Sequence, residues 1–282
     1  MILEKTPCEP REPMISVVIN TLNEEQNIGD CIESVRDFAD EVVVCDMYSD
    51  DRTVEIAQAT GARVVYHERT GFVEPARYYA ISQAKCEWVL VLDADERMTE
   101  PLALKLHEIA REDAFDVVSL SVLYWYFGGW VRHGGFSENI WHRFFRKSVY
   151  LDVYNQNEET VHKNFSALKK LENKIVLPPQ FHILHLAYPT IEKYACKTLG
   201  RYAVIEAEHY YQQGRRFSFF RMIGEPLLDI GKRFIWKGGY RDGLRGFILI
   251  VLRAGYRFAI WANAWLLEEL ARQNDGATSD TE

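Results

Sequence analysis

The chain has 282 residues, of which 48% are hydrophobic and 26% are charged. This composition excludes a disordered or collagen-like chain, and the length suits one large domain with an additional segment. The five cysteines form no CxxC pair, which argues against a disulfide framework or a zinc knuckle. Residues 1–13 lack the apolar core of a signal peptide, so we expect a cytoplasmic protein.

The net charge of −8 is unevenly distributed along the chain. Between residues 215 and 257, ten Lys or Arg residues stand against three acids, and apolar residues are interleaved with them. Cations mixed with apolar side chains favour an anionic membrane surface over nucleic acid as the partner. We therefore expect contact with a membrane surface and none with nucleic acid.

The first predicted strand is the β-branched run at residues 14–20. A polar segment follows at residues 21–28, and a helical pattern begins at Ile28. This order predicts a β–α unit whose connecting loop lies at the ligand-binding edge of a sheet. Residues 23–27 can contact a ligand at this edge or can cap the N-terminus of the following helix, and their residue types leave both open.

A second strand is predicted at residues 41–46 and ends in Asp46. A helix is expected to follow from about residue 53, then a third strand at 62–66 and a helix at 74–84 that carries Arg77. Asp46 can hydrogen-bond a nucleobase or ribose, or it can cap the next helix; its residue type leaves both open.

The strand predicted at residues 88–93 ends in the segment LDADE at 92–96. Asp93 and Asp95 would bring two carboxylates to the carboxyl end of a buried strand, where Mg²⁺ or Mn²⁺ can hold a substrate diphosphate. A helix is expected at 101–111 and a further strand at 115–123. These repeats predict an α/β fold with parallel strands, whose polar ends meet at one edge.

Four segments in this order carry a family resemblance: TLNEEQNI (21–28), VVCDMYSDDRT (43–53), RYYA (77–80) and LDADE (92–96). Together with RHGGF (132–136), WHRFFRK (141–147), ETVH (159–162) and FIWKGGYRDGLRGF (234–247), they resemble the inverting family 2 glycosyltransferases, nearest the lipopolysaccharide core group. The resemblance implies a GT-A fold, a Rossmann-like domain that binds a nucleotide-diphospho-sugar, with a mostly helical C-terminal extension.

The resemblance also implies roles for individual residues on the donor side. The nucleotide-sugar would be bound by Thr21, Asn23, Glu25, Asp46, Arg77 and Asp93. Mn²⁺ or Mg²⁺ would be held by Asp95 and Asp93, with His162 completing the ligand set or binding diphosphate. A bound cation offsets the negative charge that grows on the leaving diphosphate.

The aromatic-rich middle of the chain is expected to form the acceptor side. Trp141 suits a sugar ring, while Arg132 and Arg143 can pair with acceptor phosphates or form surface salt bridges. Inverting transfer needs a general base that removes the proton of the acceptor hydroxyl. Relatives often have His-Glu where this chain has His162 and Lys163, so the candidates are Glu159 first, then Glu158 and Asp152.

From residue 190 the pattern becomes helical. The apolar run at 247–252 is shorter than the roughly 20 residues of a membrane span, and Arg253 and Arg257 interrupt its continuation. We therefore expect an interfacial amphipathic region, or alternatively a helix packed on the catalytic domain.

The expected domains are a tail at 1–13, a nucleotide-sugar-binding half at 14–125, an acceptor-side half at 126–189, a basic membrane-associating region at 190–272 and a disordered tail at 273–282.

The predicted activity is metal-dependent inverting transfer of a hexose, with glucose favoured, from a UDP-sugar to a lipopolysaccharide-core or other lipid-linked sugar. The predicted location is the inner face of the cytoplasmic membrane, with peripheral attachment. The alternatives are a protein or peptide acceptor and a non-catalytic nucleotide-sugar-binding scaffold. A nucleotidyltransferase of the same fold is disfavoured, because residues 21–27 lack its glycine-rich basic loop.

Overall fold

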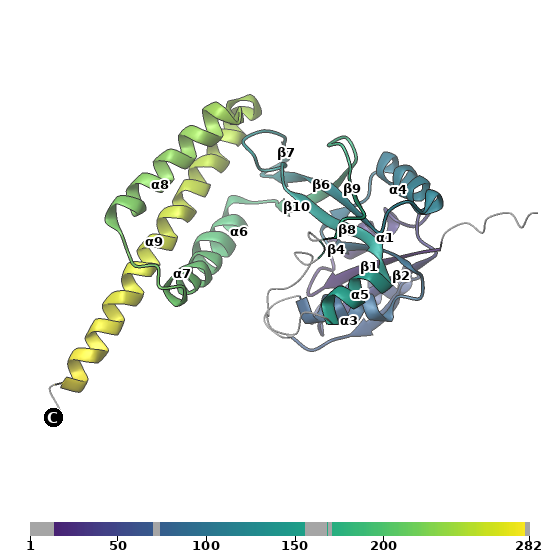
Figure 1. Cartoon of the computed structure of the whole chain (residues 1–282), viewed down its shortest axis with the longest axis horizontal. Coiled ribbons are helices and arrows are strands. Elements are labelled where there is room, and N and C mark those ends of the chain that lie inside the picture. Colours follow the sequence, from purple (N-terminus) through teal and green to yellow (C-terminus); the bar gives the residue numbers. More distant parts are fainter. Residues whose placement is uncertain (1–13, 70–73, 156–167, 169–170, 280–282) are drawn as a thin grey trace, which may run out of the picture. The chain divides into compact units, whose positions relative to one another are not determined.

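The structure is a computed structural model that describes residues 14–69, 74–155, 168 and 171–279 (Figure 1). The chain divides into two compact units. Unit 1 comprises Met1–Val122 and Ile140–His185, and unit 2 comprises Leu123–Asn139 and Leu186–Glu282. Both units are discontinuous in sequence, which differs from the expected division at residues 125 and 189.

Unit 1 contains the predicted parallel strands. They are β1 (Ile15–Thr21), β2 (Glu41–Asp46), β3 (Arg63–Tyr66) and β4 (Trp88–Asp93), arranged in the order β3-β2-β1-β4. The register pairs Thr21 with Asp46 and Asn20 with Asp93. The polar ends of three strands are therefore adjacent at one edge, as the sequence predicted.

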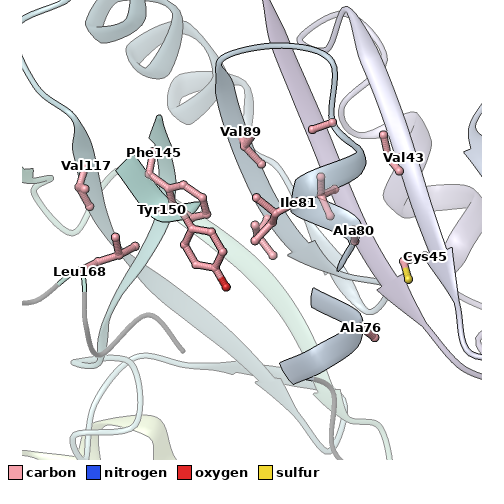
Figure 2. Close-up of a cluster of buried hydrophobic side chains, with 13 residues drawn as sticks. Val43, Cys45, Ala76, Ala80, Ile81, Val89, Val117, Phe145, Tyr150 and Leu168 are labelled. Carbon is pink, nitrogen blue, oxygen red and sulfur yellow. The ribbon is translucent and has the colours of Figure 1, made fainter. Parts of the chain in front are cut away.

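Helices connect or follow these strands. They are α1 (Ile28–Glu33), α2 (Thr53–Ala59), α3 (Glu74–Gln83) and α4 (Glu100–Glu112), the last with Pro101 in its first turn. Figure 2 shows how α3 contributes Ala76, Ala80 and Ile81 to a cluster with sheet residues such as Val43 and Val89. Small alanines let the helix approach the sheet closely, and β-branched residues fill the space between them.

An antiparallel section completes the sheet. It comprises β8 (Ile140–Arg146), β6 (Val117–Tyr126), β10 (His182–Tyr188) and β5 (Glu96–Arg97), which follow β4 in that order. The short strands β7 (Gly129–Val131) and β9 (Lys174–Val176) pair with β6. Helix α5 (Lys147–Asn155) follows β8 and places Tyr150 against Phe145 in the Figure 2 cluster.

Unit 2 is mainly helical. Its helices are α6 (Ile191–Ala195), α7 (Ala203–Gln212), α8 (Phe219–Gly231) and α9 (Gly243–Ser279), with π-helical turns η2 (Cys196–Tyr202) and η3 (Lys232–Trp236) and the 3₁₀ turn η4 (Gly239–Asp242). Helix α9 continues to Ser279, whereas we expected disorder after residue 272.

The apolar helical segment around α9 extends well beyond the apolar run at residues 247–252. Among the described residues, one helical segment, Gly239–Gln273, is long and apolar enough to cross a membrane by length and composition. One third of its apolar window is buried inside the protein. Among the described cysteines, Cys31, Cys45 and Cys86 are buried and Cys196 is exposed.

Candidate functional site

The loops that follow β1 and β2 are bound to each other. Asn23 adopts a left-handed backbone conformation (φ 56°), donates its N–H to Ser49 Oγ at 2.8 Å and accepts a hydrogen bond from the Asp50 N–H at 2.8 Å. The carboxylate of Glu25 accepts from the Arg52 N–H at 3.2 Å. Asn27 stands at the N-cap of α1 but makes no side-chain capping bond. Asn23 and Glu25 therefore join two loops instead of capping a helix.

Asp46 is completely buried at the end of β2. Its carboxylate accepts hydrogen bonds from the Ser49 N–H at 2.8 Å and from Ser49 Oγ at 2.5 Å. It therefore fixes the turn after β2, and it does not cap α2, which begins at Thr53.

At the end of β1, Asn20 and Thr21 are also buried. Neither side chain has a hydrogen-bond partner among the described residues. Buried polar groups without partners are costly, and they concentrate at functional sites.

A cluster of charged side chains lies beside the end of β4. Arg77 Nη2 on α3 contacts Asp93 Oδ1 at 2.7 Å, and Arg143 Nη2 on β8 contacts Asp93 Oδ2 at 3.3 Å. Arg143 also pairs with Glu96 Oε1 at 2.9 Å, and Glu96 Oε2 accepts the Asp93 N–H at 2.9 Å. Arg77, Arg143 and Glu96 are all buried, while Asp93 is partly exposed. Two arginines thus hold two carboxylates in fixed positions.

The two carboxylates of this cluster have opposite pKa shifts. Burial acts to raise the pKa of Asp93, but the charges of Arg77, Arg143 and His185 hold it well below its ordinary value. Burial raises the pKa of Glu96 above its ordinary value despite the opposing charge of Arg143, and the charge of Asp93 adds to that rise. Asp93 is consequently the fixed negative charge of the site.

Asp95 points to a different partner. Its Oδ2 lies 3.2 Å from Nε2 of His185, and His185 Nδ1 lies 3.6 Å from Glu96 Oε1. Burial opposes protonation of His185, but the hydrogen bond to Asp95 and the nearby carboxylates hold its pKa above the ordinary value. Asp95 and His185 are each about one fifth exposed, so this pair is accessible from outside.

Asp95 and His185 are the accessible residues of this site that carry metal-ligand atoms. Their Oδ2 and Nε2 atoms, 3.2 Å apart, share a hydrogen bond here, and the imidazole would have to lose its proton to bind a divalent cation. Among the described residues, no group of three or more His, Cys, Asp or Glu side chains could hold a metal ion. The arrangement suits an ion that takes most of its ligands from substrate phosphates and water.

The other predicted site residues have different positions. Trp141 is 39% exposed, and the Arg143 guanidinium lies 5.8 Å from its ring centroid. Asp152 is exposed on α5, and Arg132 is exposed in unit 2. Glu158, Glu159 and His162 lie outside the described residues.

The sequence did not single out two residues of this cluster, Glu96 as the partner of Arg143 and His185 as the partner of Asp95. Strand β10 pairs with β5 so that His185 stands opposite Glu96. The segments are far apart in sequence, and a histidine in a largely apolar strand carries no signal of its own, all the more as His182 stands in the same strand. Arg143, expected on the acceptor side or in a surface salt bridge, instead lies in the buried cluster.

Comparison with known proteins identifies the family. Residues 16–176 match the model of "Glycosyl transferase family 2". An uncharacterized glycosyltransferase of Rickettsia typhi is 29% identical over 249 residues, covering 86% of this chain and 84% of the relative. The lipopolysaccharide core biosynthesis glycosyltransferase LpsC of Rhizobium meliloti is 25% identical over 289 residues, covering 94% and 97%.

A solved structure supports the fold. S. aureus TarS superposes with a TM-score of 0.50 at 18% identity, covering 88% of this chain and 55% of the TarS chain. The parallel strands, the connecting helices and this likeness confirm the predicted α/β glycosyltransferase fold of the GT-A type. The chain belongs to glycosyl transferase family 2 and is a glycosyltransferase similar to the LpsC group.

Proposed function

We propose that this glycosyltransferase moves a hexose, with glucose as the first candidate, from a UDP-sugar to a lipopolysaccharide-core or other lipid-linked sugar. The reaction would invert the anomeric carbon and use Mn²⁺ or Mg²⁺, at the inner, anionic face of the cytoplasmic membrane. The observation that carries this proposal is the cluster at the end of β4, where two arginines and the Asp95–His185 pair adjoin one carboxylate. The likeness to LpsC supports the lipopolysaccharide-core acceptor.

The nucleotide would lie along the ends of β1 and β2. Thr21, Asn23, Glu25 and Asp46 stand on these two strands or on the loops that Asn23 and Glu25 join. We assign Asn23 and Glu25 to holding the loops in the shape that receives the nucleotide, and Asp46 to the nucleobase edge through its remaining lone pairs. Arg77 would face the diphosphate while keeping Asp93 ionised.

The metal would be held by Asp95 and His185, with Asp93 behind them. This places an imidazole other than that of His162 beside the acidic motif. A carboxylate with an imidazole favours Mn²⁺ over Mg²⁺, because Mg²⁺ binds almost only oxygen ligands. When bound, the ion would offset the charge that grows on the departing diphosphate.

On the acceptor side, the base must remove one proton as the acceptor oxygen attacks the anomeric carbon and the bond to UDP breaks. Glu159 remains our first candidate, with Glu158 and Asp152 as the others. The partly exposed ring of Trp141 would stack on an acceptor sugar, and exposed Arg132 would bind an acceptor phosphate. For Arg143 we propose a positioning role through Glu96 and Asp93.

The test is a turnover assay with UDP-glucose, GDP-glucose and dTDP-glucose, each with and without Mn²⁺, in the presence of lipopolysaccharide-core acceptor. We expect product only with UDP-glucose and Mn²⁺. Asp95→Asn and His185→Ala should each weaken Mn²⁺ binding, measured by calorimetry, and lower kcat. Glu108→Gln, an exposed carboxylate on α4, is the matched control and should match the wild type.

Donor binding without any product would favour the scaffold alternative, whereas product on a peptide but not on the lipid-linked sugar would favour a protein acceptor. Unchanged Mn²⁺ affinity in both site variants would contradict the metal assignment.

A further inference from the structure

One face of the α8–η3 segment in unit 2 is apolar and exposed. It consists of Phe220, Leu227, Leu228, Ile235 and Trp236, and we call it the α8 face. Phe220 and Trp236 are 87% and 88% exposed, and the other three exceed 60%. Exposed apolar surfaces of this kind are rare on soluble monomers and mark interaction sites.

The opposite side of the same segment is packed against α9, which lies alongside α8 (Figure 1). Met222 contacts the cluster that contains Trp261, and Ile230 and Phe234 contact the cluster that contains Leu249. Glu225 accepts a hydrogen bond from Trp261 Nε1 at 2.9 Å. The α8 face is therefore a second apolar side of a helix whose other side is already occupied.

The exposed charged residues of this stretch are cations. All residues from 215 to 241 are described, and the exposed charged ones are Arg215, Arg216, Arg221, Lys232 and Arg241. The exposed acid Glu138, from another part of unit 2, pairs with Lys237. The acids in this range, Glu225 and Asp229, are partly buried and engaged with Trp261 and Arg233. Folding thus turns the acids of this stretch inward and leaves its exposed charge positive, with Lys232 at the apolar surface itself.

The α8 face is also hollowed. Leu227, Leu228, Gly231, Lys232, Ile235 and Trp236 line a depression of about 560 Å³. Gly231, which has no side chain, is one of the lining residues, and a Cβ atom placed on it would meet nothing within 4 Å. The apolar walls suit a lipid acyl chain, and the ammonium group of Lys232 suits the phosphate group of the same lipid.

One side of helix α9 is buried and therefore cannot contact a membrane in this structure. Leu249, Ile250, Ile260, Trp261 and Ala264 are buried among the other helices of unit 2. If α9 crossed a bilayer, these side chains would have to leave their present contacts. Its packing therefore favours a role as the support of α8.

We propose that the α8 face docks onto an anionic lipid bilayer, with α9 packed behind it and outside the membrane core. This rests on the proposed action at a membrane, and it identifies the element that makes the contact. The aromatic and aliphatic side chains enter the headgroup region while the surrounding cations pair with lipid phosphates.

The test is flotation of the full chain with vesicles of equal parts phosphatidylglycerol and phosphatidylcholine, compared with phosphatidylcholine alone. We expect binding to the anionic vesicles, release by high salt or alkaline carbonate, and at least about a tenfold loss of affinity for Leu228→Glu or Trp236→Glu. Leu104→Glu, a 66% exposed leucine on α4, should bind like the wild type. Circular dichroism checks that each variant is folded.

Unchanged binding of Leu228→Glu and Trp236→Glu would overturn the proposal, and so would protein that resists carbonate extraction as a spanning helix does. A dimer in vesicle-free solution that Trp236→Glu dissociates would assign the face to a second copy instead. UDP-glucose hydrolysis with Mn²⁺ and no vesicles should be unaffected by these variants. Intact docking without hydrolysis would count against the proposed function alone.

Discussion

Removal of the Glu96 side chain should show whether the buried cluster depends on it. Glu96 is completely buried, its Oε1 lies 2.9 Å from Arg143 Nη2, and its Oε2 accepts the Asp93 N–H. Breaking a buried ion pair by removing one partner costs about 3–5 kcal/mol. Because Asp93 Oδ2 still lies 3.3 Å from Arg143, we expect Glu96→Ala to cost about 3 kcal/mol.

For a domain of this size, about 3 kcal/mol corresponds to a fall in Tm of roughly 6–12 °C. Thermal and urea denaturation followed by circular dichroism measure both quantities. Glu96→Gln keeps the hydrogen-bond acceptor and the volume, so its loss of stability should be smaller.

A double-mutant cycle separates the pair from the individual side chains. Glu96→Ala and Arg143→Ala should each be costly, and the double variant should lose about 2 kcal/mol less than the sum of the two. Additivity within about 0.5 kcal/mol would refute the reasoning, because it would show that the two groups do not stabilise each other.

Three further predictions concern other positions. Burial acts to raise the pKa of Glu41, but hydrogen bonds outweigh it and hold this pKa below its ordinary 4.5. The stability that the ionised Glu41 carboxylate contributes is therefore lost as pH falls. Glu41→Gln should cost about 1–2 kcal/mol at neutral pH and flatten the acid limb of a stability–pH curve. Gly246→Ala would place Cβ 2.3 Å from a backbone oxygen and should destabilise the protein by about 1–3 kcal/mol. Gly255→Ala meets only a 3.5 Å contact and should stabilise it by up to about 1 kcal/mol. If urea denaturation gave changes in unfolding free energy of the same sign for both variants, this prediction would be contradicted. Asp93→Asn should lower Tm because Asp93 pairs with the buried Arg77, whereas Asp95→Asn should leave Tm nearly unchanged because its pair with His185 is partly exposed. Equal losses of Tm would show that the two carboxylates do not differ in their contribution to stability.

Much of unit 1 could be predicted because its signals are local. Three of the four parallel strands are short apolar runs that end in a polar residue, and the helices that follow have a helical periodicity. Parallel pairing then brings Asn20, Asp46 and Asp93 to one edge without further information. The positions of these residues therefore followed from the sequence, while their hydrogen-bond partners did not.

The partners that the sequence did not indicate depend on contacts between distant segments. Whether Arg143 faces solvent or a buried carboxylate is decided by the placement of β8 beside β4, about 50 residues apart in the chain. His185 lies beside Asp95 only because β10 pairs with the two-residue strand β5. Helix α9 extends to Ser279, because a polar composition after Arg272 does not by itself end a helix that has already been nucleated.

The acidic motif divides into two parts because the chain turns within it. Strand β4 ends at Asp93, a turn follows, and β5 begins at Glu96, so Asp93 and Asp95 do not share a strand face. Asp93 meets two guanidinium groups, which would repel a cation bound directly at its carboxylate. Asp95 meets one imidazole, which can itself become a ligand. In the proposed reaction, a cation at Asp95 and Arg77 at Asp93 would then present positive charge to the same diphosphate from two sides, which would favour its departure.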